Sequence, residues 1–306
     1  MSTRIVGAGL AGLLAAHAWP AARVYEVEPA PRAAHRALLR FRSDAVARLT
    51  GIEFTPVTVR KGLWARGTFV APSIVLANQY SLKVLGAIEP RSIWNLDPVQ
   101  RWVAPETLYE QLVEAVGARI TWGTAFDFRA PLARPVVNTA PLPAVLEALD
   151  IAPALRPQLH RAPIYVARFR VSSCAVNQTV YFPDVGMHVY RASLTGDLLI
   201  VEAMGPEFEA ELPQVLAAFG LLGHYGINVE RIDTVDQRYG KILELPTAAR
   251  RALLHQLTRE HGIYSLGRFA TWRNVLLDDV VQDIDVLRRL MKASAYDRTR
   301  FAAGNK

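Results

Sequence analysis

The motif G-A-G-L-A-G at residues 7–12 constrains the fold more than any other feature of the chain. Residues 4–6 before it form a short apolar run, residues 13–19 after it suit a helix, and residues 23–27 suit a second strand. In such a strand–turn–helix–strand unit, the first glycine permits a tight turn and the second lets the backbone approach a ligand closely. The third lets the helix pack against the strand. The sequence therefore predicts a βαβ unit at the start of the chain.

An acid at the end of the second strand sharpens this prediction. Glu28 follows Gly7 by about 20 residues, the spacing of the carboxylate that binds a ribose 2′-hydroxyl in Rossmann-type sites. The helix N-terminus offers unpaired N–H groups and a positive dipole to phosphates. Because a carboxylate repels a 2′-phosphate, NADP is disfavoured. The sequence thus favours a dinucleotide site over the alternative, a structural turn that binds nothing.

The rest of the chain alternates between helical and strand-like patterns. Strands are predicted at residues 119–121 and 136–139 and, as an antiparallel set, between 164 and 203. Residues 51–103 suggest short strands and turns. Helices are predicted at residues 105–116, 205–222, 247–261 and 278–293. We therefore predict an α/β fold: a Rossmann-type domain comprising residues 1–50, 104–145 and 235–306, interleaved with an antiparallel-sheet substrate domain comprising 51–103 and 146–234.

Composition and the order of segments bear on the expected cellular location of the protein. No stretch approaches the ~18 apolar residues of a membrane span, and a strand at residues 4–6 leaves no room for a signal peptide ahead of it. A single cysteine, Cys174, excludes an internal disulfide. We expect a cytoplasmic protein that does not interact with membranes. The net charge of +7 favours an anionic partner or reflects an arginine-rich genome.

Three segments carry a family resemblance. The opening GAGLAGLLAAH with VYEVE at 24–28, RPVVNTAP at 134–141 and IYSLGRFATWRNVLLDDVVQDI at 263–284 resemble, in this order, the flavin-dependent amine oxidase and UDP-galactopyranose mutase superfamily. The resemblance implies FAD as the cofactor and the GR2-like variant of the Rossmann-type domain. It is much weaker in the substrate region. The chain departs from the family where Glu28 is followed by PAPRAAHRALLRFRS rather than by a glycine-rich basic stretch.

The resemblance assigns cofactor-binding roles to individual residues. Gly7, Gly9, Leu10, Ala11 and Gly12 would hold the pyrophosphate and Glu28 the adenosine ribose. Phe126, in a strand after Gly123, would contact the adenine side, and Thr139 lies in the turn that closes over the flavin domain. Gly267 and Arg268 would approach the flavin, and Asp278, Asp279 and Val280 open a helix whose dipole would face it. Arg36, Arg40 or Arg42 would replace the usual phosphate-contacting arginine.

Four residues are candidates for the substrate cavity: Tyr190, Arg191, Tyr239 and Lys241. Arg191 could bind a carboxylate through two parallel hydrogen bonds, or it could be a surface hairpin arginine. Lys241 could orient water or peroxide at the flavin, as lysines do in some amine oxidases. The scattered histidines give no metal-ligand spacing, so no metal site is expected.

The function hypotheses follow from these assignments. The first is FAD-dependent oxidation of a C–N bond, with an amine-bearing substrate and molecular oxygen as electron acceptor. The whole-chain layout and LLRFRSDAVARLTG at 38–51 also resemble compact bacteriophage FAD enzymes that modify thymine. This resemblance would make the substrate an amino-acid-modified thymine in DNA. Alternatives are a redox-neutral flavin mutase acting on a nucleotide sugar and a non-catalytic FAD-binding module. The sequence does not indicate an oligomeric state.

Overall fold

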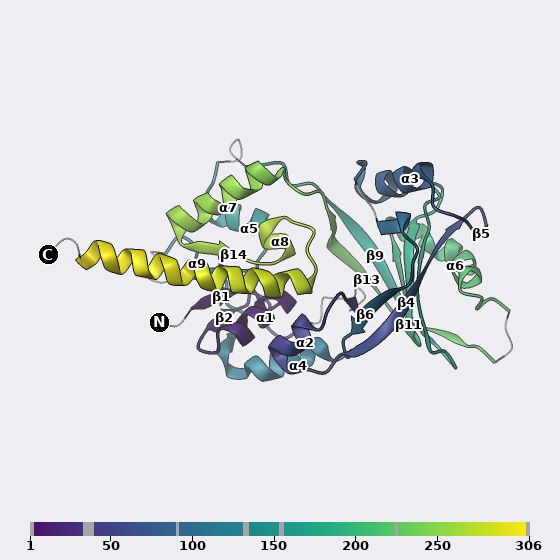
Figure 1. The fold of residues 1–306 in the computed structure, drawn as a ribbon, viewed down its shortest axis with the longest axis horizontal. Coiled ribbons are helices and arrows are strands. Elements are labelled where there is room, and N and C mark those ends of the chain that lie inside the picture. The colour runs from purple at the N-terminus through teal and green to yellow at the C-terminus, as the bar shows by residue number, and fades with distance from the viewer. Residues whose placement is uncertain are drawn as a thin grey trace.

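Two sheets organise the molecule (Figure 1). The computed structural model describes residues 3–32, 40–89, 92–130, 135–152, 156–223 and 226–303. A five-stranded parallel sheet forms one body, and a nine-stranded mixed sheet forms the other. The α/β class and the Rossmann-type first body confirm the sequence prediction.

The five-stranded sheet has the order β14-β8-β1-β2-β7, with all neighbours parallel. Its strands are β1 (Arg4–Val6), β2 (Arg23–Tyr25), β7 (Ile120–Thr121), β8 (Val136–Asn138) and β14 (Ile263–Ser265). Successive side chains point to opposite faces of a strand, so the sheet has an apolar core on each side. Ile5 faces the core under α1 (Leu10–Ala18), whereas Val6 faces the core on the other side.

Helices cover both faces of this sheet (Figure 1). One core takes side chains from α1, α2 (Ala45–Thr50), α4 (Leu108–Val116) and the long C-terminal helix α9 (Leu277–Ala303). The opposite core takes them from α5 (Leu142–Ala148), α7 (Thr247–His261) and the residue after α8 (Arg268–Thr271). None of the described helices, α9 included, has a span long and apolar enough to cross a membrane.

The nine-stranded sheet has the order β13-β9-β12-β11-β10-β4-β6-β3, and β5 pairs with β4 beside this path. Its strands are β3 (Arg40–Phe41), β4 (Thr55–Ala65), β5 (Thr68–Phe69), β6 (Val99–Val103), β9 (Arg161–Val171), β10 (Val176–Tyr181), β11 (Val189–Gly196), β12 (Leu198–Ala203) and β13 (Val229–Ile242). The antiparallel strands expected between 164 and 203 are present. The sheet as a whole is mixed because β10 runs parallel to β4.

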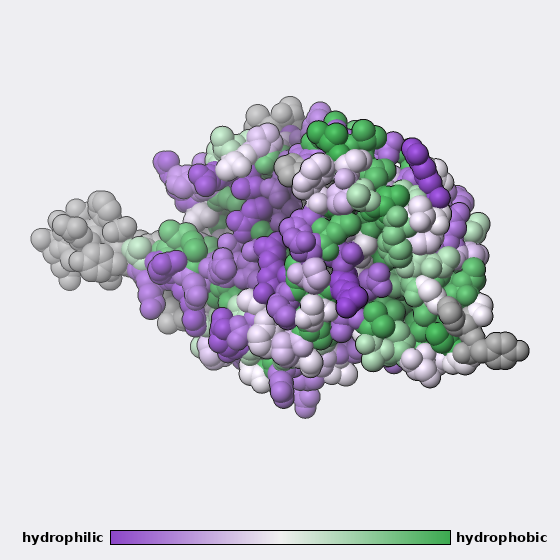
Figure 2. Space-filling model, turned by 45° about the vertical axis from the view of Figure 1, so that its right-hand side comes forward, coloured by the Kyte–Doolittle hydropathy of each residue, from purple (hydrophilic) through white to green (hydrophobic). Residues whose placement is uncertain are grey.

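The two faces of this sheet have different neighbours. The outer face packs against α6 (Leu212–Ala218), which follows a 3₁₀ turn at Pro206–Glu211. The inner face packs in part against α3 (Ile74–Leu85) through Tyr80 and Val84. On the face shown in Figure 2, hydrophilic residues gather over the middle of the molecule and hydrophobic residues toward the end that carries this sheet.

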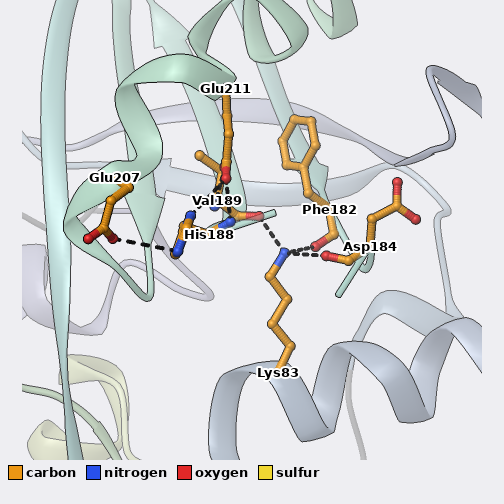
Figure 3. Close-up of polar contacts among 7 residues, drawn as sticks. All are labelled: Lys83, Phe182, Asp184, His188, Val189, Glu207 and Glu211. Atoms are coloured by element: carbon orange, nitrogen blue, oxygen red, sulfur yellow. Dashed lines mark hydrogen bonds and ion pairs between the residues drawn. The ribbon is translucent and has the colours of Figure 1, made fainter. Parts of the chain in front are cut away.

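A partly buried lysine fastens α3 to the sheet (Figure 3). The Nζ of Lys83 donates to the carbonyls of Phe182 and Asp184 at 2.9 Å and of Val189 at 2.6 Å. Beside it, Glu211 accepts from the backbone N–H groups of His188 at 2.6 Å and Val189 at 2.7 Å. Burial lowers the pKa of Lys83 to about 8, so the amine stays largely protonated at neutral pH. These contacts fix the loop between β10 and β11.

Some segments differ from their predicted form. The region 51–103, expected to hold short strands and turns, contains the 11-residue strand β4 and the 12-residue helix α3. Gly86 ends α3 in the left-handed region at φ 70°, which is a common signal for the end of a helix. Polar residues interrupt the apolar spacing of residues 74–85, so the sequence did not predict this helix. β13 runs through residue 235, the predicted start of the last dinucleotide-domain segment, and stays in the nine-stranded sheet to Ile242. The domain boundaries themselves stay predictions.

Candidate functional site

The glycine turn between β1 and α1 is built for close backbone contact. A Cβ on Gly12 would lie 1.9 Å from the carbonyl oxygen of Gly7, and Gly7 itself has a φ of +97°. Neither position therefore tolerates a side chain. Gly9 is exposed, with open space where a Cβ would stand. It caps α1 without any side-chain hydrogen bond, and the first turn of α1 holds no acid. The first N–H groups of the helix are thus available to an anion.

The carboxylate at this turn belongs to Glu26. Its Oε2 accepts from the N–H of Ala8 at 2.5 Å, and its Oε1 accepts from the N–H of Glu28 at 3.1 Å. β2 ends at Tyr25, which pairs with Val6, so Glu26 stands directly opposite Gly7. Glu28, the predicted ribose ligand, is exposed two residues farther on. The geometry makes Glu26 the better candidate, and sequence reasoning missed it because the strand was expected to continue to Val27.

Two predicted cofactor residues support the turn from behind. The hydroxyl of Thr139 donates to the carbonyl of Val6 at 2.7 Å, so this side chain is already engaged in holding the turn. Phe126 packs edge-on against Tyr25 at 5.5 Å between ring centroids. The strand expected after Gly123 is not formed; residues 124–127 are irregular. Phe126 nonetheless lies beside β2, and its contact with adenine stays a prediction.

The segment around Gly267 connects the glycine turn to the nine-stranded sheet. A Cβ on Gly267 would lie 2.9 Å from the Cβ of Ala11, so the two backbones approach closely. The approach of Gly267 to a flavin stays a prediction. Next to it, Arg268 donates through Nη2 to the carbonyl of Gly240 at 3.3 Å. Gly240 precedes Lys241 on β13. The first turn of α1 and the inner face of the sheet are therefore joined through one short segment.

The N-terminus of α9 forms a second connection. The carboxylate of Asp278 accepts from the N–H of Arg42 at 3.1 Å and from the N–H and hydroxyl of Ser43 at 3.0 and 2.7 Å. Asp279 lies 3.6 Å from the guanidinium of Arg42 and accepts from the N–H of Leu276 at 2.8 Å. These carboxylates are engaged in holding residues 42–43.

One more predicted cofactor residue belongs to the same region. Val280 is 2% exposed and packs in the core under α1, so only its backbone could face a ligand. Arg36 lies outside the described residues.

A buried polar network occupies the inner face of the nine-stranded sheet. Glu202, 1% exposed, accepts from the hydroxyl of Tyr190 at 3.0 Å and from Nη2 of Arg191 at 2.7 Å. Nε of Arg191 also donates to Glu202. Burial raises the pKa of Glu202, but Arg191 more than offsets this, so the pKa falls below its ordinary value. Lys241 lies over the ring of Tyr190, 4.3 Å from its centroid.

This network changes the role expected for Arg191. The bidentate carboxylate partner predicted for it is supplied within the chain by Glu202, which stands opposite on β12. Tyr190 is fully buried, and burial raises the pKa of its phenol well above the ordinary value. Neither side chain is thus arranged as a free clamp for substrate. A catalytic role for either stays a prediction.

Arg40 lies with this network rather than at the glycine turn. Although β6 and β4 separate β3 from β10 in the sheet, Nη2 of Arg40 reaches Oγ1 of Thr179 on β10 at 3.1 Å. The edge of the sheet therefore curls over its inner face. Burial and the neighbouring Arg191 lower the pKa of Arg40 to about 9. Its guanidinium is still charged at neutral pH.

The fourth cavity candidate, Tyr239, packs elsewhere. Its ring contacts Phe269 and Trp272 at 5.5 and 6.2 Å between centroids, and the guanidinium of Arg161 lies 4.3 Å above it. This places Tyr239 against α8 at the junction of the two bodies. The structure therefore brings Tyr190, Arg191 and Lys241 together and sets Tyr239 apart from them in a separate aromatic cluster.

Comparison with known proteins identifies the fold. No model of a known protein family and no curated protein matches the chain. Among solved structures, reduced UDP-galactopyranose mutase is similar with a TM-score of 0.67 at 15% identity, over 95% of this chain and 94% of that chain. An oxidoreductase from Methanosarcina mazei is similar with a TM-score of 0.53 at 10% identity, over 94% of this chain and 100% of that chain. A protein from Photorhabdus luminescens subsp. laumondii, described as an FAD-containing monooxygenase, is similar with a TM-score of 0.52 at 10% identity, over 96% of this chain and 89% of that chain.

Proposed function

We propose that this chain binds FAD and is a flavin-dependent oxidoreductase. The observation that carries the proposal is the uncapped N-terminus of α1, where Gly7 and Gly12 permit the close approach that a pyrophosphate needs. The similarity of the whole fold to a flavin mutase and to a protein described as an FAD-containing monooxygenase supports FAD over NAD.

The residues of the site fit such a cofactor. The N–H groups at the start of α1 would hold the pyrophosphate, and Glu26 would bind the adenosine ribose. Gly267 packs closely beside Ala11, where a side chain would collide, and the N-terminus of α9 would stabilise negative charge at the flavin end. FAD would supply a two-electron acceptor at the inner face of the nine-stranded sheet.

The reaction we propose is oxidation of a C–N bond. It needs an enclosed, oriented cavity and a deprotonated amine rather than a strong acid or base. Lys241, held over Tyr190, carries a positive charge on the inner face, which would favour the neutral form of a nearby amine. The imine product would be hydrolysed by water, and oxygen would accept the electrons.

A narrower form of the proposal concerns the substrate. The resemblance to compact bacteriophage enzymes and the net charge of +7 support an amino-acid-modified thymine in DNA. Filter binding across a salt gradient tests it, because phosphate contacts lose affinity steeply as salt rises. A flat salt dependence, or no binding at low salt, removes DNA as the substrate.

The second candidate function is a redox-neutral flavin mutase acting on a nucleotide sugar. It is supported by the TM-score of 0.67 to UDP-galactopyranose mutase across nearly the whole of both chains. Such an enzyme would need its flavin reduced and would consume no oxygen.

Anaerobic mixing separates these reactions. An oxidase substrate bleaches the flavin band near ~450 nm, and air restores the band. Turnover only after chemical reduction, with no oxygen consumed, would identify the mutase. A bound flavin that stays oxidised with amines and is inactive with nucleotide sugars after reduction would contradict both enzyme proposals.

A further inference from the structure

Arg40 is a partly buried cation without an ion pair in the described part of the chain. Its Nη2 donates to neutral oxygens, Oγ1 of Thr179 at 3.1 Å and the carbonyl of Gln178 at 3.4 Å. Its Nε is shielded from solvent and has no hydrogen-bond partner among the described atoms. Buried guanidinium groups usually have a carboxylate partner, because an uncompensated charge costs free energy away from water. Among the described residues, Arg40 therefore has no carboxylate as a direct ion-pair partner.

The neighbouring carboxylate does not supply one. Both oxygens of Glu202 accept from other donors: Oε2 from Nε of Arg191, and Oε1 from Nη2 of Arg191 and the hydroxyl of Tyr190. Each acidic oxygen is thus already bound within the network. Glu202 is paired directly with Arg191 and acts on Arg40 only through space, so it is no direct ion-pair partner of Arg40.

Further cations lie around the same place. Arg191 and Arg101 both act on Arg40 as like charges and help to lower its pKa. Arg101 also acts on Lys61, which stands opposite Thr179 on the neighbouring strand. Like charges held together on a partly buried surface repel one another unless an anion lies between them. The inner face of the sheet therefore carries a cluster of positively charged side chains around Arg40.

Hydroxyl groups complete the arrangement. Oγ1 of Thr179, which accepts from Arg40, lies 3.1 Å from Oγ of Ser193, which stands opposite on β11. On the same strand, Arg191 is two residues before Ser193 and pairs with Tyr181. Diagonal neighbours across a sheet lie about 7–8 Å apart, a gap that the long arginine side chains can span. An oxyanion at Arg40 would therefore lie close to Arg191.

We propose that Arg40, with Arg191 behind it and Thr179 beside it, binds the doubly charged oxyanion of the substrate, a phosphate or a chemically equivalent group. A dianion neutralises more of the positive charge around Arg40 than a singly charged carboxylate does. The planar guanidinium group suits such an anion, because it can donate two parallel hydrogen bonds to two oxygens of the same group. This inference rests on and deepens the proposed function, since it names the chemistry of the substrate, and it disfavours the phosphodiesters of DNA, which carry one charge each. The anion site itself does not depend on flavin.

Calorimetric titration of the flavin-loaded protein with sodium sulfate at low ionic strength tests the site. Sulfate carries the same charge throughout the neutral range. We expect one site per chain in the unmodified protein. Arg40→Met should weaken sulfate binding about ten- to a hundredfold, the effect of losing hydrogen bonds to a charged group. Sodium acetate, a monoanion, should bind at least about tenfold more weakly than sulfate.

The matched control is Arg259→Met, which removes one positive charge from an exposed position on α7. It should bind sulfate like the unmodified protein. Arg40→Lys keeps the charge but not the fork and should fall between the two, and it serves as the second variant should Arg40→Met fail to fold. Equal sulfate affinity in the Arg40 variants and the Arg259 control would overturn the inference, as would acetate binding as tightly as sulfate.

The two proposals fail separately. Absorbance of the same samples reports bound flavin, and the titration reports the anion. Sulfate binding that depends on Arg40 in a protein that cannot retain FAD would support the anion site and refute the proposed function. Retained FAD with no sulfate binding would refute the anion site and leave the proposed function standing.

Discussion

Replacing Glu202 with glutamine removes the charge that balances Arg191 while nearly preserving the shape of the side chain. The Glu202 side chain is 2% exposed and that of Arg191 31% exposed, so the variant leaves a partly buried guanidinium uncompensated. Breaking a buried ion pair from one side costs about 3–5 kcal/mol. Because Arg191 retains some solvent and glutamine still accepts a hydrogen bond, we expect a loss of about 2–3 kcal/mol in the free energy of unfolding.

The assay is thermal or urea unfolding followed by circular dichroism. With an unfolding entropy of about 2.1 cal/mol/K per residue, the 306-residue chain should melt about 3–5 °C lower. The control is Glu207→Gln, because the Glu207 side chain is 70% exposed and its removal should cost less than about 0.5 kcal/mol. A double variant that also carries Arg191→Met should recover part of the loss, since no unpaired guanidinium remains.

The effect also depends on pH. The folded-state pKa of Glu202 lies below its ordinary 4.5, so the unfolded chain binds this proton more readily. The stabilisation is therefore fully present above pH 4.5 and is lost as the pH falls through the lower folded-state pKa. The difference between the unmodified protein and Glu202→Gln should shrink in that acid range. A variant as stable as the unmodified protein at pH 7 would refute the reasoning.

Three further predictions concern the glycine turn and α3. Gly12→Ala should abolish FAD retention, because its Cβ would meet the carbonyl oxygen of Gly7 at 1.9 Å, whereas Gly186→Ala has open space and should retain FAD; equal FAD content after gel filtration would contradict this. Glu26→Gln should weaken FAD binding about tenfold or more in fluorescence titrations and Glu28→Gln much less, and the reverse order would restore Glu28 as the ribose ligand. Lys83→Met leaves three carbonyls without their donor and should cost about 2–3 kcal/mol in urea unfolding, against almost nothing for the exposed Lys292→Met; an unchanged midpoint would show that Lys83 does not fasten α3.

The first body was predictable because its signals are local. The glycines of residues 7–12 have steric roles that few other arrangements satisfy, and the helix and strands around them follow from periodicity. The structure sets Glu26 at the turn, two residues before the predicted Glu28, because alternation alone does not show where β2 stops. Pairing with β1 decides this, since Gly7 N–H donates to the carbonyl of Tyr25 and sets Glu26 at the turn.

The inner face of the nine-stranded sheet was less predictable because its contacts are long-range. Arg40 meets Thr179 across 139 positions of sequence, through the curl of the sheet. Glu202 did leave one signal: a lone acid within the apolar run LLIVEAM, which indicates a buried, paired carboxylate. Its partner, Arg191, lies 11 positions away on the neighbouring strand, and that register follows from the turn between β11 and β12.

FAD binding by the turn at residues 7–12 and the segments joined to it underlies every function proposed for the chain. Its most direct test is the absorbance spectrum of the purified protein after incubation with FAD and removal of unbound cofactor by gel filtration. We expect bands near ~370 and ~450 nm, with about one flavin per chain. A folded protein that shows no flavin absorbance after this treatment would contradict the claim.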